Sequence, residues 1–403
     1  MQDNIIKLPS RVQWSCYDNL LNEINEKKKN TMTLYLDFSS VNRIYPNGII
    51  PIIAEIKTLE ESIDIRCIGI TSKLYKYMDK MGWINLIKKH IDEIFIQDDV
   101  QIGNDVYCKL VAFNDYNTLN KAITEIIQHC SDAIEFAPGS ITAFEWVLNE
   151  LTDNVINHSK ATIGLFQTVI NKKRIDIVIC DNGIGIVTKI KNKFGLNMSD
   201  MEAVIKATQK GVTSGEGQGN GLAGARDISK ETEGYFNIVS GTADWSVDNG
   251  IEKKDVFKSY FNGTYIELHF NTDKEINCAN ILNGEYDPIT VLESYLDEDG
   301  NDVIFRLKDH ANNFGNRKTA ENFRIKLRNI IQEFEGINHV IIDFDGVNMI
   351  SSSFADEFIG KMLAEYNIID YMKKFNFINI NQVCKSIIGG VVSQRLKNSQ
   401  VSF

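Results

Sequence analysis

Glu150 and Asn154 are the two residues whose types and spacing first indicate chemistry. They belong to the stretch NELTDNVINHS (149–159), in which apolar residues recur at helical spacing. Residues four apart lie on the same face of a helix, so the carboxylate and the amide are neighbours. A carboxylate can take a proton from an attacking water or hydroxyl, and an amide oxygen can bind Mg²⁺. The same pair is also typical of a solvated helix edge, and this stretch alone does not decide between the two.

A second segment, RIDIVICDNGIGI (174–186), predicts a strand that ends at Asp181. A carboxylate at a strand end can accept a hydrogen bond from an exocyclic amine. Gly183 and Gly185 lack a Cβ atom and would let the backbone approach a flat ring closely. The alternative interpretation is an ordinary turn after an edge strand.

A third and a fourth segment follow in the chain. Gly217, Gly219 and Gly221 alternate directly before a predicted helix, and backbone N–H groups at such a helix N-terminus can bind an anion. Thr264 lies near the start of the predicted strand NGTYIELHF (262–270). A glycine alternation by itself also fits a flexible loop. The order and spacing of the four segments are therefore more informative than any one of them.

Together, the four segments resemble the GHKL ATPase fold, which is shared by gyrase, heat-shock chaperones of the ninety-kilodalton class, histidine kinases and mismatch-repair ATPases. The resemblance covers roughly residues 105–272, and NELTDNVINHS looks closest to the corresponding box of the anti-sigma serine kinases. It implies an α/β sandwich built from a mixed sheet with helices on one face. It also implies ATP and Mg²⁺ as cofactors, and an ATPase or a protein serine kinase as the activity.

The resemblance gives each motif residue a role. Glu150 matches the general base, Asn154 the Mg²⁺ ligand and Asp181 the carboxylate that reads adenine. The other nucleotide-binding residues that it implies are Gly183, Gly185, Gly217, Gly219, Gly221 and Thr264. The stretch between the second and third segments (187–216) would be the lid over the nucleotide. Further candidates for phosphate contacts in this lid are Lys210, Thr213 and Ser214.

The first and last quarters of the chain contain a repeated pattern. LYLDFSSVNRIYPNGIIPIIAEI begins at Leu34, and VIIDFDGVNMISSSFADEFIGKM begins at Val340. Aligned without gaps, the two stretches share an Asp-Phe pair, a Val-Asn pair and an Ile. Each predicts a buried strand, a short turn and an apolar-periodic helix. A duplication explains the match, although two unrelated strand–loop–helix units would look similar.

The shared pattern resembles STAS-type domains, the fold of anti-anti-sigma factors. The C-terminal copy most resembles a STAS-like family often joined to ATPases. The predicted organisation is therefore a STAS-like domain (1–100), a GHKL ATPase domain (101–275) and a second STAS-like domain (276–403). The resemblance implies protein partners that bind through the STAS-like domains.

In anti-anti-sigma proteins the phosphoacceptor is a serine at the loop-to-helix junction. Ser353 falls nearest that position in the C-terminal copy, with Ser352 beside it, and both are candidate phosphoacceptors. The N-terminal copy has Asn47 there, which cannot accept a phosphoryl group as a serine does, so this copy is expected to be a non-switching partner or a docking surface. The three serines 351–353 would equally serve to cap a helix that begins near Phe354.

Composition narrows the function classes. The net charge of -11 and a pI of about 5.2 argue against broad binding to nucleic acid or to an anionic membrane. No apolar run has the length of a membrane span. The seven scattered cysteines, without a CxxC pair, indicate reduced thiols and a cytoplasmic location. His129 lies on a predicted helix but is followed by Cys130 and Ser131 instead of an acidic residue, which argues against a sensor histidine kinase.

Two functional hypotheses remain. In the first, the chain is a Mg²⁺-dependent ATP-binding regulatory protein of the anti-sigma or partner-switch type, which hydrolyses ATP or phosphorylates a STAS serine. In the second, it is an ATP-gated dimerising ATPase of a stress or phage-defence module, whose STAS-like ends bind partner proteins. Phosphotransfer to a serine would favour the first, and hydrolysis coupled to homodimer formation the second. A nucleotide-binding scaffold without turnover is a third class, against which the intact Glu150 argues.

Overall fold

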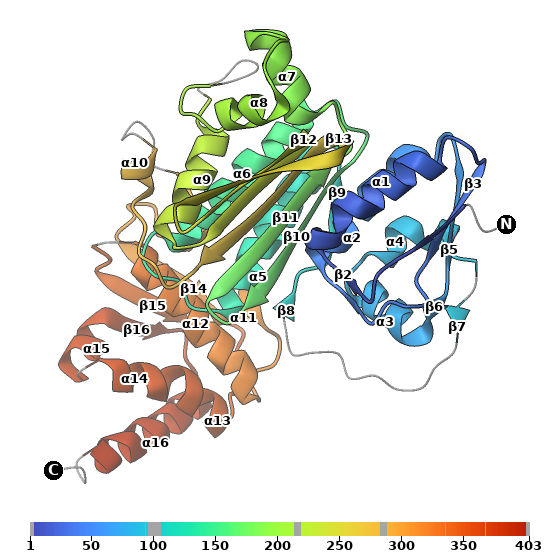
Figure 1. Cartoon of the computed structure of the whole chain (residues 1–403). Coiled ribbons are helices and arrows are strands. Elements are labelled where there is room, and N and C mark those ends of the chain that lie inside the picture. Colours follow the sequence, from blue (N-terminus) through green and yellow to red (C-terminus); the bar gives the residue numbers. More distant parts are fainter. Residues whose placement is uncertain are drawn as a thin grey trace. The chain divides into compact units, whose positions relative to one another are not determined.

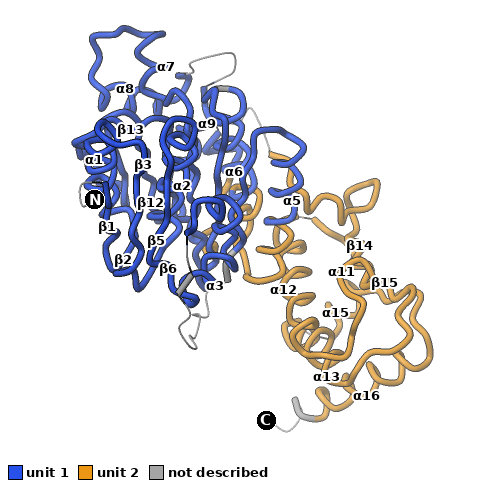
Figure 2. The backbone as a smooth tube through the Cα atoms, turned by 90° about the vertical axis from the view of Figure 1, so that its right-hand side faces the viewer, with its two compact units in different colours: residues 1–126, 144–271, 278–286 blue, residues 127–143, 272–277, 287–403 orange. Residues whose placement is uncertain are grey.

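The computed structural model (Figure 1) describes most of the chain. The described residues are 4–92, 94–95, 106–212, 219–282, 288–334, 336–366 and 368–399. The chain forms two compact units, which Figure 2 distinguishes by colour. The first unit comprises residues 1–126, 144–271 and 278–286, and the second comprises residues 127–143, 272–277 and 287–403. The α/β class that the sequence predicts is confirmed.

Residues 4–92 form a three-stranded parallel sheet with helices packed against it. The strands, in sheet order, are β1 (Ile5–Lys7), β3 (Thr33–Asp37) and β5 (Asp64–Ile68). Two short parallel pairs join β2 (Arg11–Val12) to β4 (Arg43–Ile44) and β6 (Ile70–Thr71) to β7 (Ile94–Phe95). The helices are α1 (Tyr17–Lys27), α2 (Pro46–Leu59), α3 (Ser72–Lys80) and α4 (Ile84–Ile87), with short 3₁₀ turns η1 (Trp14–Cys16) and η2 (Lys88–His90).

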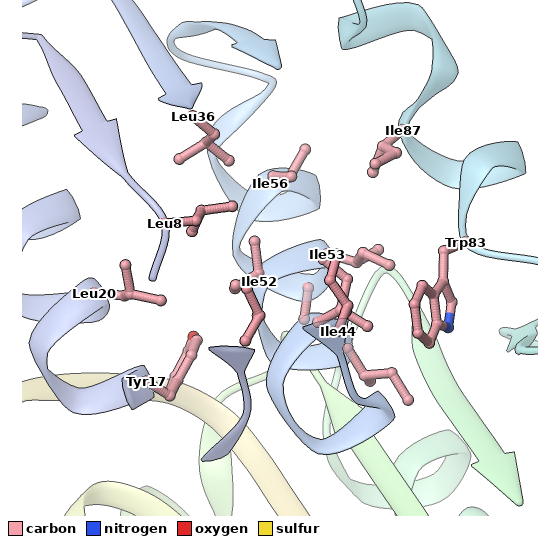
Figure 3. Packing of buried hydrophobic residues seen from close by; sticks show 14 of the residues in the cluster. Leu8, Tyr17, Leu20, Leu36, Ile44, Ile52, Ile53, Ile56, Trp83 and Ile87 are labelled. Atoms are coloured by element: carbon pink, nitrogen blue, oxygen red, sulfur yellow. The ribbon is translucent and has the colours of Figure 1, made fainter. Parts of the chain in front are cut away.

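Helix α2 is buried around its whole circumference. All of its residues from Pro46 to Ile56 are buried except the half-buried Asn47. A helix that is apolar all round must be covered on more than one face. One face packs into the core drawn in Figure 3, where Ile52 and Ile56 lie among side chains of the neighbouring elements. Helix α2 also lies against β10 (Gly164–Asn171) and β11 (Arg174–Asp181) of the central sheet.

The central sheet has six strands. Its order is β12-β13-β11-β10, and β10 pairs along its other edge with both β8 and β9. The remaining strands are β8 (Val106–Tyr107), β9 (Val111–Phe113), β12 (Tyr235–Asp248) and β13 (Ile251–Asn271). Every ladder described in this sheet is antiparallel, so the expectation of a mixed sheet is wrong in this detail. The reason is local: tight turns join β10 to β11 and β12 to β13, and a hairpin pairs its strands antiparallel.

Helices cover one face of this sheet and the N-terminal segment covers the other (Figure 1). The helices of this region are α5 (Tyr116–Ala133), α6 (Ser140–His158), α7 (Gly185–Phe194), α8 (Asp200–Ala207), α9 (Gly221–Glu231) and α10 (Cys278–Ile281). On the opposite face, side chains of the sheet belong to the same buried cluster as the N-terminal core. These side chains are Leu165, Val178, Cys180, Val239, Phe257, Phe261 and Tyr265. Because strand side chains alternate, the residues between them point to the helical face.

The second unit contains a three-stranded parallel sheet of its own. Its strands, in sheet order, are β14 (Asp302–Arg306), β15 (His339–Asp343) and β16 (Phe375–Ile378). The helices that follow residue 287 are α11 (Leu307–His310), α12 (Arg317–Glu333), α13 (Ser352–Ala355), α14 (Lys361–Glu365), α15 (Ile368–Lys374) and α16 (Gln382–Ser399). A 3₁₀ turn η3 (Val291–Tyr295) precedes β14, and a π-helical turn η4 (Asp356–Gly360) joins α13 to α14.

The two three-stranded sheets repeat one another in detail. The Phe38 N–H donates to the Ile68 carbonyl at 2.8 Å, and the Phe344 N–H donates to the Ile378 carbonyl at 3.1 Å. The next hydrogen bond of the turn, from the Val N–H to the Phe carbonyl, is 2.9 Å in both copies. Helices α2 and α13 begin at matching positions, Pro46 and Ser352. This agreement supports the interpretation of the two ends as a duplication.

None of the helices within the described residues is both long and apolar enough to span a membrane.

Candidate functional site

A pocket opens on the helical face of the central sheet, between α6, α7, α9, β11 and β13. Its walls enclose about 500 Å³, including the part open to solvent. The residues that line it are Leu151, Asn154, Val155, Ser159, Ile179, Asp181, Gly185, Ile186, Lys189, Leu222, Thr264 and Ile266. Asn154, Asp181, Gly185 and Thr264 were predicted from three separate stretches of sequence, and the fold brings them to one pocket.

Asp181 is the buried acidic residue of this pocket. It is the last residue of β11, opposite Thr264 of β13 in the sheet register, and only 2% of it is exposed. Its Oδ1 accepts a hydrogen bond from the Gly183 N–H at 2.8 Å. Burial raises the pKa of Asp181 to about 7, although hydrogen bonds from Gly183 and Thr264 and the charge of Lys189 oppose the shift. In its ionised form Asp181 can accept a hydrogen bond from a ligand donor in a wall that also contains apolar side chains such as Ile179 and Ile266.

The glycines after Asp181 allow close approaches within the protein itself. A Cβ on Gly183 would collide with the Ser159 carbonyl at the end of α6. Gly185 has φ +74, and a Cβ there would lie 2.6 Å from Ser240 Oγ and 2.7 Å from the Gly263 carbonyl oxygen. Gly185 lines the pocket. The turn after β11 is thus packed tightly against α6, β12 and β13, which is a reason for glycine that the sequence pattern did not indicate.

Glu150 and Asn154 lie together at the N-terminus of α9. A Cβ on Gly221, the first residue of α9, would be 2.5 Å from Glu150 Oε2 and 3.6 Å from Asn154 Nδ2. Both side chains are half-buried. Burial, and secondly the charge of Asp153, raises the pKa of Glu150 above its ordinary value. The side chains of Glu150 and Asn154, which were predicted to be neighbours from their spacing, therefore face the glycine-rich start of α9 and not bulk solvent alone.

The glycine-rich loop is described only in part. Gly217 lies outside the described residues, as do Thr213 and Ser214. Gly219 has φ +72, and a Cβ there would lie 2.6 Å from the Val212 backbone, so this position favours glycine. The helix predicted after the loop is confirmed as α9.

Two lysines near the site differ in position and in partners: Lys210 contacts protein groups, and Lys189 lines the pocket. Lys210, a candidate phosphate contact, donates to the Ile281 carbonyl at 2.9 Å and lies 3.5 Å from Asp227. Lys189, which the sequence analysis did not single out, lines the pocket one turn after Gly185 on α7. Burial lowers the pKa of Lys189, and the charge of Asp181 opposes that shift. The four-residue spacing from Gly185 was the signal that could have identified it.

The segment predicted to be the lid contains two helices, α7 and α8. Ser199 and Glu202 form a capping box that starts α8. Asp200 accepts hydrogen bonds from the Thr242 N–H and Oγ1 at 2.8 and 2.9 Å, and it also pairs with Lys191. Although burial alone would raise it, these bonds hold the pKa of Asp200 below its ordinary value. Asp200 therefore ties α8 both to Thr242 in the middle of β12 and to Lys191 of α7.

The donor set fits a nucleotide with its own Mg²⁺ better than a resident metal ion. Among the described residues, no three His, Cys, Asp or Glu side chains are grouped so that they could hold a metal. Asn154 supplies one amide oxygen at the pocket wall, beside the Gly221 helix start. Mg²⁺ commonly takes one or two protein oxygens and fills its other positions with phosphate oxygens and water.

Comparison with known families agrees with this geometry. Residues 139–273 match the family of histidine kinase-, DNA gyrase B- and HSP90-like ATPases. Residues 319–383 match a STAS-like domain of unknown function (DUF4325). The chain thus carries a GHKL ATPase domain and, toward its C-terminus, a STAS-like domain, which fits the predicted GHKL ATPase with STAS-like flanks. No curated protein matches the chain.

The candidate phosphoacceptors lie in the second unit, at the start of α13. Ser351 is the helix cap, because its Oγ accepts a hydrogen bond from the Phe354 N–H at 3.0 Å. Ser351 Oγ and Ser353 Oγ are 2.9 Å apart, and Ser353 is half-buried. Ser352 is exposed. One serine therefore serves the cap, which leaves the hydroxyl of Ser352 facing solvent.

Proposed function

We propose that the chain is a Mg²⁺-dependent ATP-binding regulatory protein of the anti-sigma or partner-switch type. The observation that carries the proposal is the single pocket that unites Asp181, Thr264 and Asn154, with Glu150 beside the start of α9. The proposed organisation is the three domains of the sequence analysis: residues 1–100, 101–275 and 276–403. The STAS-like flanks support a regulatory role, since they are expected to bind proteins.

Each side chain has a proposed task that follows from its surroundings. Asp181 accepts a hydrogen bond from the adenine amine, with Thr264 beside it, and Ile179 and Ile266 pack against the ring. Asn154 offers its amide oxygen to Mg²⁺, which when bound neutralises phosphate charge and orients the phosphates. The N–H groups at the start of α9 face the phosphates. Glu150 takes the proton from the attacking water or hydroxyl.

The raised pKa of Glu150 supports its role as the base. A general base works best when its pKa lies near the operating pH, and burial moves Glu150 in that direction. A water as the nucleophile makes the protein an ATPase. A serine hydroxyl, such as that of Ser353 or Ser352, makes it a protein serine kinase.

One experiment distinguishes these outcomes. The protein is incubated with γ-labelled ATP and Mg²⁺, and the label is followed to protein or to free phosphate. Label on protein supports the partner-switch form of the proposal. Free phosphate together with ATP-dependent dimers in light scattering supports the alternative, a dimerising ATPase whose STAS-like ends bind partners. Absence of ATP binding in calorimetry contradicts the proposal altogether. The variant to compare with wild type is Asn154→Ala, which should weaken the Mg²⁺-dependent binding of ATP.

A further inference from the structure

The central strands present one face to the pocket and the other to the N-terminal STAS-like domain. On β13, Thr264 and Ile266 line the pocket, and Tyr265 between them is fully buried in the core shared with residues 4–92. Strand β11 has the same arrangement: Ile179 and Asp181 line the pocket, and Cys180 between them belongs to the shared core. Neighbouring residues of the same strand therefore contact the N-terminal domain on one face of the sheet and the nucleotide pocket on the other.

Trp14 contacts this side of the sheet directly. Its ring stacks on Tyr265 with 3.9 Å between ring centroids and an angle of 9° between the planes. It also stacks on Tyr17 of its own domain at 5.5 Å, and its indole N–H donates to Asp244 at 3.3 Å. Stacked aromatic pairs of this kind add to the free energy of burial. Trp14 thus holds Tyr265 in place from the domain opposite the pocket.

A buried hydrogen-bond chain runs beside this stack. Asn47 Nδ2 donates to Glu267 Oε1 at 3.1 Å, and the Tyr265 hydroxyl donates to Glu267 Oε2 at 2.8 Å. Glu267 is only 6% exposed, and His269 Nε2 also lies 3.1 Å from its Oε1, so the carboxylate depends on these three partners. Asn47 lies at the position where the C-terminal copy has Ser353. The N-terminal copy therefore uses this position to bind the sheet.

We propose that the N-terminal STAS-like domain is a fixed part of the nucleotide site, and that Trp14 and Asn47 are positioning residues that set nucleotide affinity through Tyr265. The inference rests on the proposed ATP binding. Closely packed interiors transmit small displacements instead of absorbing them. A shift of Tyr265 displaces its neighbour Thr264, which pairs with Asp181 in the sheet. The domain that resembles a switchable partner is here a permanent component.

Asn47→Asp is the sharpest test, because it keeps the size of the side chain but replaces the amide that donates to Glu267 with a carboxylate. It places a second carboxylate against the buried Glu267, and two like charges in a buried site repel strongly. We expect affinity for Mg²⁺-ATP, measured by calorimetry, to fall about tenfold, within the usual range of coupling between sites. Asn30→Asp makes the same chemical change at an exposed residue of the same domain and should leave affinity unchanged.

Trp14 gives an independent test with a rescue. Trp14→Ala removes the stack on Tyr265 and should weaken Mg²⁺-ATP binding to a similar extent. Trp14→Phe keeps a six-membered aromatic ring for the stack but loses the pyrrole part of the indole, including the N–H that donates to Asp244, so it should restore much of the affinity. All variants are compared below their melting temperatures, as established by circular dichroism.

A merely structural role predicts a different outcome. In that case Asn47→Asp and Trp14→Ala lower the melting temperature but leave the affinity of the folded protein unchanged, and this result would overturn the inference. Asn47→Ala, which removes the donor without adding charge, provides the same comparison if Asn47→Asp does not fold. A wild-type protein that fails to bind Mg²⁺-ATP contradicts the proposed function itself, so the two failures are distinguishable.

Discussion

At the scale of single residues, Asp181 makes ligand binding depend on pH. Burial raises its pKa to about 7, so it is partly protonated at neutral pH. A ligand amine that donates to the carboxylate favours the charged form, so binding lowers the pKa and releases a proton. The unbound protein then holds more protons than the complex below about pH 7. We expect affinity for Mg²⁺-ATP to rise as the pH increases to about 7 and to level off above it.

Calorimetry of wild-type protein and Asp181→Asn across this pH range checks the prediction. Asp181→Asn replaces one acceptor oxygen by a donor and cannot titrate. It should bind on the order of 1–3 kcal/mol more weakly above pH 7, the cost of an unmet buried polar group. A pH dependence that persists in Asp181→Asn would assign the titration to another group.

Glu150 separates binding from chemistry. Glu150→Gln keeps the shape of the side chain beside Gly221 but removes the proton acceptor. A base acts in the transition state, so ATP affinity should stay nearly constant while turnover falls about a hundredfold or more. Calorimetry and phosphate release measure the two quantities. Wild-type turnover in Glu150→Gln would show that the carboxylate is only part of the helix packing.

The pocket residues could be predicted because each belongs to a short motif with local geometry. Asp181 ends a recognisable strand, and Asn154 follows Glu150 at helical spacing. The packing role of Gly183 could not be predicted, because it depends on where α6 ends in space, next to the Ser159 carbonyl. Lys189 was missed for a related reason, since its place in the pocket follows from the path of α7.

At the scale of elements, the start of α9 must lie close to α6. Gly221→Ala would place a methyl carbon 2.5 Å from Glu150 Oε2, which the flexible carboxylate can avoid by moving. We expect turnover to fall about tenfold or more, because the proposed base is displaced. The fold should be kept, but Gly221 is the first residue of α9, so the preference of helix interiors for alanine over glycine, about 1 kcal/mol, does not apply in full. Phosphate release and thermal melting check the two parts.

Gly390→Ala is the matched control for this change. Gly390 also lies within a helix, α16, and a Cβ there would meet no atom within 4 Å. It should raise stability by up to about 1 kcal/mol, as expected inside a helix, and leave turnover unaffected. Equal turnover in Gly221→Ala and Gly390→Ala would contradict the close approach of α9 and α6.

Most helices and strands could be predicted from apolar periodicity, but the way they pack against one another could not. Helix α2 is apolar on every side, and the sequence offered no way to tell which element covers its second face. The answer, the central sheet, lies more than a hundred residues away along the chain. The resemblance implied a mixed sheet, whereas the tight turns after β10 and β12 favour hairpins and hence antiparallel pairing.

At the scale of the whole molecule, two copies of one fold have different surroundings at the same position. In the N-terminal copy, Asn47 donates to the buried Glu267. In the C-terminal copy, Ser353 contacts the Ser351 hydroxyl instead. Asn47 thus makes a contact within its own unit, whereas Ser353 and its neighbours present hydroxyl groups at the start of a helix. Of the two copies, we therefore propose a serine switch only for the C-terminal one.

The serines of that copy allow capping and phosphorylation to be tested separately. Ser351→Ala removes the cap of α13 and should cost about 1 kcal/mol of stability, seen in thermal melting, without removing a phosphorylation site. Ser352→Ala and Ser353→Ala should change stability little, and the double variant should abolish any phosphate that mass spectrometry finds after incubation with Mg²⁺-ATP.

A phosphate near the N-terminus of a helix is favoured by its dipole, but Asp356 and Glu357 follow closely and oppose it. Arg317 and Arg395 lie against Asp356 and reduce that repulsion. A wild-type protein that turns over ATP and carries no phosphate on either serine is an ATPase with a capped helix, and the partner-switch form of the proposal would then be wrong.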